Sequence, residues 1–518
     1  MRLTYFKMPL VRDHSLANGS SLIAALLGTF IALYVMQSLV LRVRRYLRMQ
    51  HIRGPQTAGW SRLWLLRQAL GGECHKVFFE TNEKYDPNWL ATGPLAKVGP
   101  YHVLTSDPDL IRKINAARTT YQRGEWYNAL RFDPSKDNIA TCPPEKHLEL
   151  RAKMAAGYSG KGVEGIESKI DDNILALVQL LETRYVSANL PFDFGRKAQY
   201  FTLDVISDLA YGDPFGFLDK DADRYDYIRI AEEQLGILLM LTIYPWIISL
   251  LSSPVLKFLL PTDKDLVGFG RFMAIAKEKA GERFGPKKKL QKDMLGSFVA
   301  HGLSQSEAES EILFQIVAGS DTTATAIRCT LLLIITTPRV HTALLSEISA
   351  LAPTLKKQQV ISDEQAREMP YLQAVIKEGL RWFPPVTGMM SKKVPPGGDE
   401  WKGVRLPPGT LIGYSAWGVM RARQFWGDDA AEFRPERWLE ASPAQLKAME
   451  ASLALTFGYG KWQCLGKDVA LMELNKVLVE LLRRFDLCIV DPTKPWNSVC
   501  ASIFIQSNFW IKAYARNL

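Results

Sequence analysis

The chain has 518 residues, of which 47% are apolar and 23% are charged, and its formal net charge is +10. This composition excludes a disordered, collagen-like or disulfide-stapled protein and predicts a large globular body. Residues 1–53 hold eight cations and one acid, which accounts for +7 of the +10. The rest of the chain is nearly neutral and has no basic stripe, so the sequence argues against a nucleic-acid partner.

An apolar segment near the N-terminus predicts a membrane anchor. No residue between Asp13 and Arg42 carries a formal charge, and Leu22–Leu41 are twenty mainly aliphatic residues, enough to cross a bilayer as a helix. A cleaved signal peptide and a buried core helix are the alternatives, and the length of the segment disfavours the first. Basic residues follow the segment, so the positive-inside rule places the N-terminus in the lumen and the body in the cytosol. These residues are Arg42, Arg44, Arg45 and Arg48.

Four segments are expected in chain order. Residues 1–21 are a lumenal N-terminus, 22–41 a transmembrane helix, 42–66 a basic flank and hinge, and 67–518 one large domain. Helical periodicity dominates this domain, and strand-like runs are short, as at Tyr101–Thr105 and Leu411–Ser415. The predicted fold class is therefore mainly α with small β-sheets. The six cysteines show no C-x-x-C pair and no histidine at zinc-ligand spacing, which argues against a disulfide framework and a structural zinc site and fits a reducing compartment.

The segment from Gln234 to Leu256 contains no charged residue. Its length would allow a second membrane span. Pro245 and Pro254 interrupt the segment, which instead suits short helices lying against the bilayer surface.

A long helix is predicted from Ser304 to about Thr336, because Ser304 and Glu307 fit a capping box and Pro338 follows. Its centre, Ala318–Thr323, places a glycine, an acid and hydroxyl residues where helix formers would be favourable. A buried Asp321 is costly unless it is paired or functional. An exposed polar face of a surface helix is the alternative.

A second helix is predicted over Ser362–Trp382, ending before Pro384 and Pro385. Glu378 and Arg381 are three residues apart and share one face, so they can pair. Such pairs are usually exposed. The proline-bounded segment 433–438 supplies Arg437, which could join the pair in the interior.

The segment 457–466 is a glycine-rich loop, and an amphipathic helix follows it. Its glycines allow the backbone to approach a flat group closely. Cys464 lies just ahead of the helix N-terminus, where the dipole and free amides favour a thiolate. Such a thiolate could ligate a metal. A buried structural cysteine is the alternative.

Taken together and in this order, these elements resemble the cytochrome P-450 family over nearly the whole chain. At finer grain the chain is most similar to fungal microsomal members of the pisatin demethylase type. The resemblance implies a cytochrome P-450 fold, with domain 67–518 catalytic, and a haem whose axial ligand is the Cys464 thiolate. The loop matches F-x-x-G-x-[RH]-x-C-x-G through Phe457, Gly460, Cys464 and Gly466. Further matches are the structural triad Glu378, Arg381 and Arg437 and the acid–alcohol pair Asp321 and Thr322.

The family pattern also implies contacts to the haem propionates. His147 and Arg151 match H-x-x-x-R, and Lys392 falls where the family often has an arginine. Ordinary surface cations are the alternative. Trp462 departs from the family, which usually has Arg or His there, but its indole N–H can still donate to a propionate.

The resemblance implies a monooxygenase that inserts one oxygen atom from O2 into a hydrophobic small molecule. Asp321 and Thr322 would supply protons and hydrogen bonds at the oxygen site, and Gly319 would thin the helix there. The chain has no G-x-G-x-x-G after a strand, so a separate reductase is expected to deliver the electrons. The resemblance implies that this partner is NADPH-cytochrome P-450 reductase. The expected location is the endoplasmic reticulum membrane. The expected pathway is fungal secondary metabolism, with a terpenoid, polyketide or alkaloid substrate.

Two alternatives to this activity remain open. One is a haem-thiolate isomerase or dehydratase that needs no reductase. The presence of Asp321 and Thr322 argues against it, because such enzymes often lose this pair. The other is a non-catalytic membrane protein that binds haem or lipid, and its only support is Trp462.

Overall fold

The computed structural model describes residues 14–516 except 86–94, 134, 352–354 and 357. The predicted lumenal segment 1–21 thus lies partly outside the described residues. The helices are α1 (His14–Arg48), α2 (Leu63–Leu70), α3 (Cys74–Tyr85), α5 (Pro108–Asn115), α6 (Pro144–Tyr158), α7 (Ile166–Leu180), α8 (Phe194–Tyr211), α9 (Phe217–Lys220), α10 (Tyr227–Ile243), α11 (Trp246–Leu251), α12 (Gly268–Gly281), α13 (Met294–Ala300), α14 (Gln305–Thr336), α15 (Pro338–Leu351), α16 (Asp363–Arg367), α17 (Pro370–Trp382), α18 (Ala416–Val419), α19 (Arg423–Trp426), α20 (Arg437–Glu440), α21 (Pro443–Leu453) and α22 (Lys467–Arg484).

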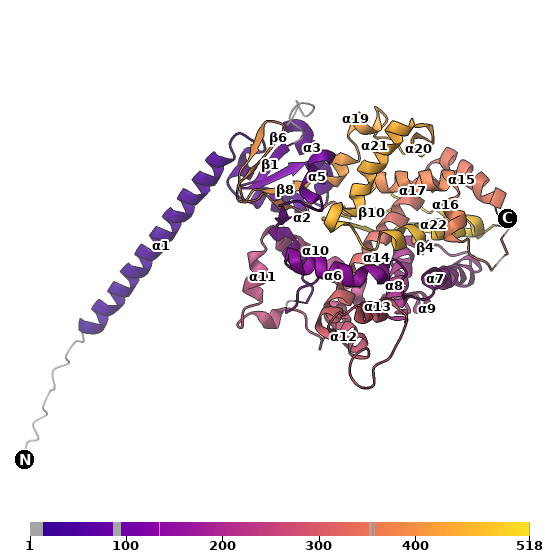
Figure 1. The fold of residues 1–518 in the computed structure, drawn as a ribbon, viewed down its shortest axis with the longest axis horizontal. Helices are drawn as coiled ribbons and strands as arrows, with labels where there is room; N and C mark the ends of the chain where they lie inside the picture. Colours follow the sequence, from indigo (N-terminus) through magenta and orange to yellow (C-terminus); the bar gives the residue numbers. More distant parts are fainter. Residues whose placement is uncertain (1–13, 86–94, 134, 352–354, 357, 517–518) are drawn as a thin grey trace, which may run out of the picture.

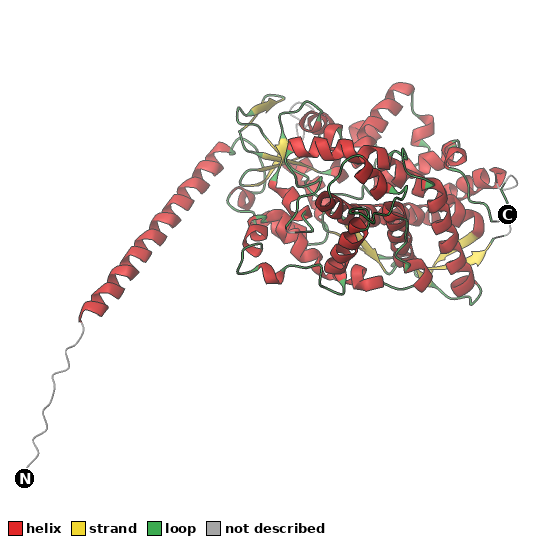
Figure 2. Ribbon diagram, turned by 60° about the horizontal axis from the view of Figure 1, so that its bottom comes forward, coloured by secondary structure: helices red, strands yellow, loops and turns green. Residues whose placement is uncertain are grey.

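The strands are short and form small sheets (Figure 2). They are β1 (Leu95–Gly99), β2 (His102–Thr105), β3 (Gln122–Arg123), β4 (Phe192–Asp193), β5 (Lys392–Lys393), β6 (Asp399–Trp401), β7 (Val404–Leu406), β8 (Leu411–Tyr414), β9 (Phe485–Ile489), β10 (Asn497–Cys500), β11 (Phe504–Ser507) and β12 (Trp510–Ala515). The largest sheet has the order β1-β2-β8-β5-β3, in which β2 and β8 are parallel, with His102 beside Leu411. The predicted mainly helical fold with small sheets is confirmed.

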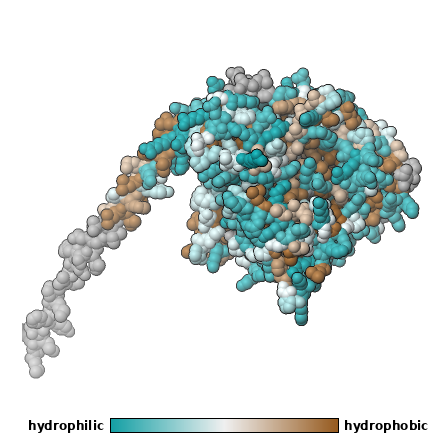
Figure 3. Space-filling view, viewed as in Figure 1, coloured by the Kyte–Doolittle hydropathy of each residue, from teal (hydrophilic) through white to brown (hydrophobic). Residues whose placement is uncertain are grey.

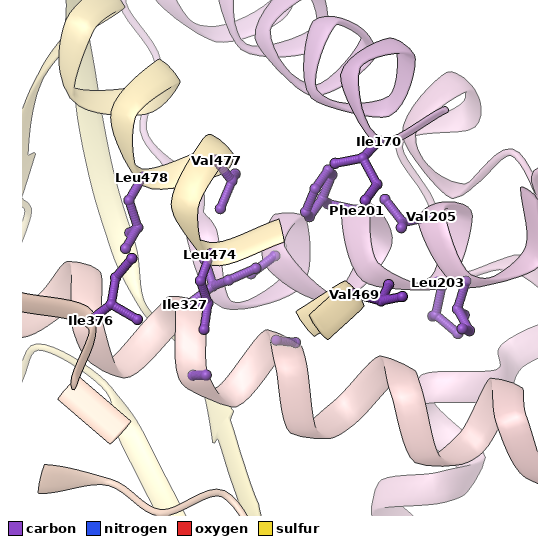
Figure 4. Close-up of a cluster of buried hydrophobic side chains, with 14 of the residues drawn as sticks. Ile170, Phe201, Leu203, Val205, Ile327, Ile376, Val469, Leu474, Val477 and Leu478 are labelled. Carbon is purple, nitrogen blue, oxygen red and sulfur yellow. The ribbon is translucent and has the colours of Figure 1, made fainter. Parts of the chain in front are cut away.

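The central helix α14 begins and is buried as its sequence predicts. The Ser304 hydroxyl accepts from the Glu307 amide, and the Glu307 carboxylate accepts from the Ser304 amide, which completes the capping box. Its 32 residues span about 48 Å. α8, α12, α17 and α22 pack against it. Figure 4 shows this core, with Leu474 of α22 against Ile327 of α14 and Leu478 of α22 facing Ile376 of α17.

The N-terminal helix α1 extends away from the body (Figure 1). Its Ala25–Arg48 portion is long and apolar enough to cross a membrane, with a mean hydropathy of 1.7, and none of that window is buried. Figure 3 shows hydrophobic residues along the described part of α1 and hydrophilic ones where it meets the body. The helix continues to Arg48, so the predicted boundary at residue 41 falls inside it.

The segment after α1 packs against the body more closely than a free hinge would. Met49 and Ile52 are buried in a small core beneath β1 and β2. A Cβ at Gly54 would lie 2.0 Å from the carbonyl oxygen of Lys97 in β1. The body therefore begins before residue 67, because apolar residues next to the anchor complete the first sheet.

Two predicted elements differ in the structure. The helix expected over Ser362–Trp382 is two helices, α16 and α17, because Pro370 begins a new helix and Met369 is extended. The uncharged segment 234–256 is also divided: α10 ends at Ile243, and Pro245 precedes the short α11. Within the described residues, this segment is not among the helices long and apolar enough to span a membrane.

Candidate active site

The loop that precedes α22 is held in a compact shape by its backbone. The Cys464 N–H donates to the Phe457 carbonyl over 2.7 Å. Gly460 has a φ of +60°, and a Cβ there would lie 2.3 Å from the carbonyl oxygen of Asn115, at the end of α5. A side chain at Gly460 would therefore push the loop away from α5. Gly466 is the N-cap of α22, and a Cβ there would lie 3.9 Å from Cys464 Sγ.

The Cys464 thiol lies at the N-terminal end of α22. Burial raises its pKa, while the backbone amides of Gly466 and Lys467 and the charge of Arg151 act in the opposite direction. The residue is nevertheless exposed in a densely packed part of the molecule. The thiol thus faces open space inside the fold, with amide dipoles and a guanidinium behind it that favour the thiolate form.

Cations gather around Trp462 in this loop. Arg123 of β3 lies 4.2 Å from the indole centroid, Lys461 5.1 Å and Lys392 of β5 5.4 Å. The His147 ring of α6 lies 4.4 Å from the indole ring. Among the described residues, none of these cations forms an ion pair with a carboxylate.

The cation cluster, Arg123, Lys392 and Lys461, is electrostatically unbalanced. Burial, Arg123 and Lys461 hold the pKa of Lys392 well below its usual range. Burial with Arg123 lowers the pKa of His147 to about 3, so this ring lies beside the cluster as a neutral group. The indole nitrogen of Trp462 is buried and has no hydrogen-bond partner. Buried cations and an orphaned donor are costly unless an anion joins them. The cluster is therefore suited to bind an anionic group, such as a pair of carboxylates.

Arg151 of α6 contacts the loop backbone. Its Nη1 donates to the Gln463 carbonyl over 2.5 Å. This contact connects α6 to the residue before Cys464, so Arg151 braces the loop and places a positive charge near the thiol. A contact between Arg151 and a propionate remains a prediction.

The polar centre of α14 faces in two directions. The Thr322 hydroxyl donates to the Ala318 carbonyl over 2.8 Å. Ala318 is exposed although it lies in the middle of a core helix, so open space adjoins this face of α14. Asp321 instead accepts a hydrogen bond of 2.5 Å from Gln199 Nε2 of α8. Burial raises the pKa of Asp321 to about 6, even though Arg328 is near.

A buried guanidinium completes the network around Asp321. Arg328 Nη2 donates to Gln199 Oε1 over 2.9 Å, and its Nε donates to the Gly195 carbonyl over 2.8 Å. Gln199 therefore joins the acid to the cation through its two ends. The sequence analysis missed both residues. Arg328 could have been found, because it lies two turns after Asp321 on the same predicted helix.

Gly319 lies where α14 packs against α8. A Cβ at this position would lie 3.1 Å from two carbons of Ile206 on α8. The glycine therefore allows close packing of α14 against α8. A thinner helix at the oxygen site remains a prediction.

The predicted triad forms a separate buried cluster. Glu378 accepts two hydrogen bonds from Arg381, of 2.7 and 2.8 Å, and one of 3.0 Å from Arg437 Nε. Trp438 Nε1 and the Arg434 amide also donate to Glu378, over 2.9 and 3.0 Å. Arg381 additionally donates to the Met420, Ala430 and Glu432 carbonyls. The cluster thus fastens α17 to the loop before α20.

The residues present fit a haem. The Cys464 thiol faces open space and can supply an axial ligand, and the cation cluster with the Trp462 N–H matches two propionate carboxylates. Arg123 belongs to this cluster but was missed from the sequence, because an isolated arginine in a variable loop carries no motif. The Tyr127 ring lies 4.9 Å from the Arg123 guanidinium, and its hydroxyl accepts from Lys392 Nζ over 2.6 Å.

Comparisons with known proteins agree with this geometry. The model of the family described as Cytochrome P-450 matches residues 54–511. The cytochrome P-450 monooxygenase ABA1 of Pyricularia oryzae is 42% identical over 482 residues, which cover 91% of this chain and 94% of that protein. A relative from Botryotinia fuckeliana, also a cytochrome P-450 monooxygenase, is 40% identical over 88% of this chain and 89% of its own.

A solved structure supports the fold. The crystal structure of a cytochrome P-450DA heme domain matches with a TM-score of 0.66 at 17% identity, covering 80% of this chain and 88% of that one. The chain therefore belongs to the cytochrome P-450 family, as a monooxygenase that binds haem iron through a cysteine thiolate.

Proposed function

We propose that this monooxygenase is anchored in the endoplasmic reticulum membrane with its body in the cytosol. In this proposal it oxidises an apolar small molecule of fungal secondary metabolism, which enters from the bilayer. NADPH-cytochrome P-450 reductase delivers the electrons. The observation that carries the proposal is an exposed apolar surface on the side of the body from which α1 extends.

The anchor and the body offer two membrane contacts. The first is the apolar portion of α1, followed by the arginines that favour a cytosolic body. The second is a set of large exposed apolar side chains on α2, α10, α11 and the segment after α11: Leu63, Leu70, Ile237, Trp246, Leu250, Val255, Phe258 and Leu259. α10 packs against α2, and Figure 1 shows α2, α10 and α11 on the side of α1. This surface supports helices that lie in the membrane interface rather than a second span.

A small pocket of about 30 Å³, room for about one water molecule, lies just inside this surface. Apolar residues of α2, α3 and α10 line it together with Trp126, Met389 and Leu411, and polar residues such as Glu125 and Ser502 complete it. At its edge, Arg62 pairs with Glu125, and Arg62 Nη1 donates to the Ile243 carbonyl over 2.5 Å. The exposed apolar surface favours an apolar substrate drawn from the bilayer, for which we propose a terpenoid, polyketide or alkaloid. The finer likeness to pisatin demethylase remains a prediction.

The chemistry is divided between two groups of residues. Haem iron, when bound to Cys464, supplies the activation of O2 that allows one oxygen atom to be inserted. Thr322 presents a hydroxyl beside the open face of α14. Burial raises the pKa of Asp321 to about 6, so this carboxyl can take up and release a proton near neutral pH. Gln199 holds the Asp321 carboxyl, and we propose that movement of this carboxyl supplies protons toward Thr322.

Electrons come from a partner. The G-x-G-x-x-G string at Gly160–Gly165 joins α6 to α7 and therefore lacks the preceding strand of a dinucleotide site. Members of the family generally take electrons from a reductase, and we propose that it docks near Cys464.

Reconstitution tests the proposal. The full chain is expressed in microsomes, and its carbon monoxide difference spectrum is recorded with Cys464→Ser as the control. Product formation from candidate apolar substrates is then measured with and without NADPH and reductase. Turnover that needs both, and Thr322→Ala that consumes NADPH with little product, supports the proposal. Turnover without NADPH would instead support an isomerase, and release from membranes by alkaline carbonate would contradict the anchor.

A further inference from the structure

Two cysteines that lie far apart in the sequence are in contact in the structure. Cys74 is the first residue of α3, and Cys500 is the last residue of β10. Their Sγ atoms lie 3.6 Å apart, although 426 positions separate them in the chain. Both are buried.

The backbone holds the two thiols together. Glu73 and Cys500 form a parallel β-bridge, and the Cys500 amide donates to the Gly72 carbonyl over 2.7 Å. Cys74 follows Glu73, so it lies next to the residue that is bridged to Cys500. The sulfur atoms need to approach by about 1.6 Å to reach the bonding distance of about 2.05 Å.

The two thiols have different surroundings. The Thr387 hydroxyl lies 2.9 Å from Cys500 Sγ, and burial raises the pKa of Cys500. Cys74 instead lines the small pocket of about 30 Å³ beside α2 and α10. Cys74 is therefore the thiol that a small oxidant meets first.

We propose that Cys74 and Cys500 are a redox modification site that forms a disulfide when the protein meets hydrogen peroxide. The Cys74 thiolate attacks one peroxide oxygen, the O–O bond breaks and hydroxide leaves, giving a sulfenic acid. The Cys500 sulfur then attacks the Cys74 sulfur, the S–O bond breaks, and water leaves with the Cys500 proton. Two thiols lose two electrons in total, and one peroxide becomes two water molecules. Thiol exchange with glutathione restores the reduced pair.

The disulfide would fasten α3 to a wall of the pocket. Ser502 follows two residues after Cys500 and lines the pocket, and its carbonyl accepts from the Thr387 and Gly388 amides. A bond at Cys500 would therefore restrain the same wall that Thr387 and Gly388 hold.

Peptide mapping of the full-length holoenzyme tests the proposal. The protein is treated with hydrogen peroxide, its remaining thiols are alkylated, and it is digested without reduction by trypsin and the protease that cleaves before aspartate. Cys74 then lies in peptide 68–76, and cleavage before Asp491 separates Cys500 from the exposed Cys488. The expected product is a linked pair of the Cys74 and Cys500 peptides, lost on reduction.

Matched variants make the outcome decisive. Cys74→Ser and Cys500→Ser should abolish the linked pair, whereas Cys488→Ser should leave it unchanged. The carbon monoxide spectrum shows that each variant still folds around haem. If either serine variant fails to fold, Cys74→Ala or Cys500→Ala replaces it. The thermal midpoint of the wild type should rise on oxidation. Recovery of Cys74 and Cys500 as alkylated thiols, while Cys488 is oxidised, would overturn the proposal.

Discussion

Replacing Glu378 by glutamine should destabilise the fold strongly. Glu378 is fully buried and accepts five hydrogen bonds through two oxygens. Glutamine keeps one acceptor oxygen, and its amide nitrogen cannot accept from Arg381 Nε and Trp438 Nε1. Two lost bonds, at least one of them to a charged donor, and the loss of the negative charge between Arg381 and Arg437 correspond to about 3 to 5 kcal/mol.

This loss is large against the about 5 to 15 kcal/mol by which a typical fold is stable. Unfolding by urea, followed by far-UV circular dichroism in detergent, measures it. The control is Lys377→Ala on the preceding residue of α17, whose ion pair with Glu450 is exposed and should contribute less than about 1 kcal/mol. If Glu378→Gln unfolds within about 1 kcal/mol of wild type, as Lys377→Ala should, the buried network does not stabilise the fold.

Three further predictions concern the site. Trp462→Phe removes the orphaned indole donor and should speed haem dissociation about fivefold, which corresponds to one hydrogen bond of about 1 kcal/mol. The rate is measured by haem transfer to apomyoglobin, and Tyr459→Phe in the same loop should leave it unchanged. Equal rates in the two variants would show that Trp462 does not contact haem. Burial raises the pKa of Asp321 to about 6, so as the pH rises this carboxyl ionises in the unfolded state before it ionises in the folded state. The unfolding free energy of wild type relative to Asp321→Asn should therefore decrease as the pH rises from about 4 to about 6. A difference independent of pH would contradict this. Arg62→Ala removes the contacts of Arg62 with the Glu125 carboxylate and the Ile243 carbonyl, and it should raise the rate at which imidazole binds severalfold, as measured by stopped-flow absorbance. Arg67→Ala, at an exposed position, should leave this rate unchanged. An unchanged rate in Arg62→Ala would show that Arg62 does not limit ligand entry.

Local patterns in the sequence predicted several structural features of this protein. Hydrophobic length predicted the N-terminal helix, and the capping box with Pro338 predicted α14. The glycine-rich loop before an amphipathic helix singled out Cys464. Each of these signals lies in one stretch of chain, where backbone sterics, capping and periodicity act directly.

Tertiary structure alone decided what surrounds these residues. Arg123, Lys392 and His147 come from β3, β5 and α6, and only packing brings their side chains around Trp462. Asp321 was recognised as unusual, but its attachment to Gln199 depends on how close Gly319 allows α8 to come. Cys500 is bridged to Glu73, which brings Cys74 beside it although the two cysteines are far apart in the sequence. Such contacts join segments that are distant in the sequence, and local periodicity does not predict which segments pack together. The sequence therefore indicated which groups react, whereas the tertiary structure determined which residues surround them.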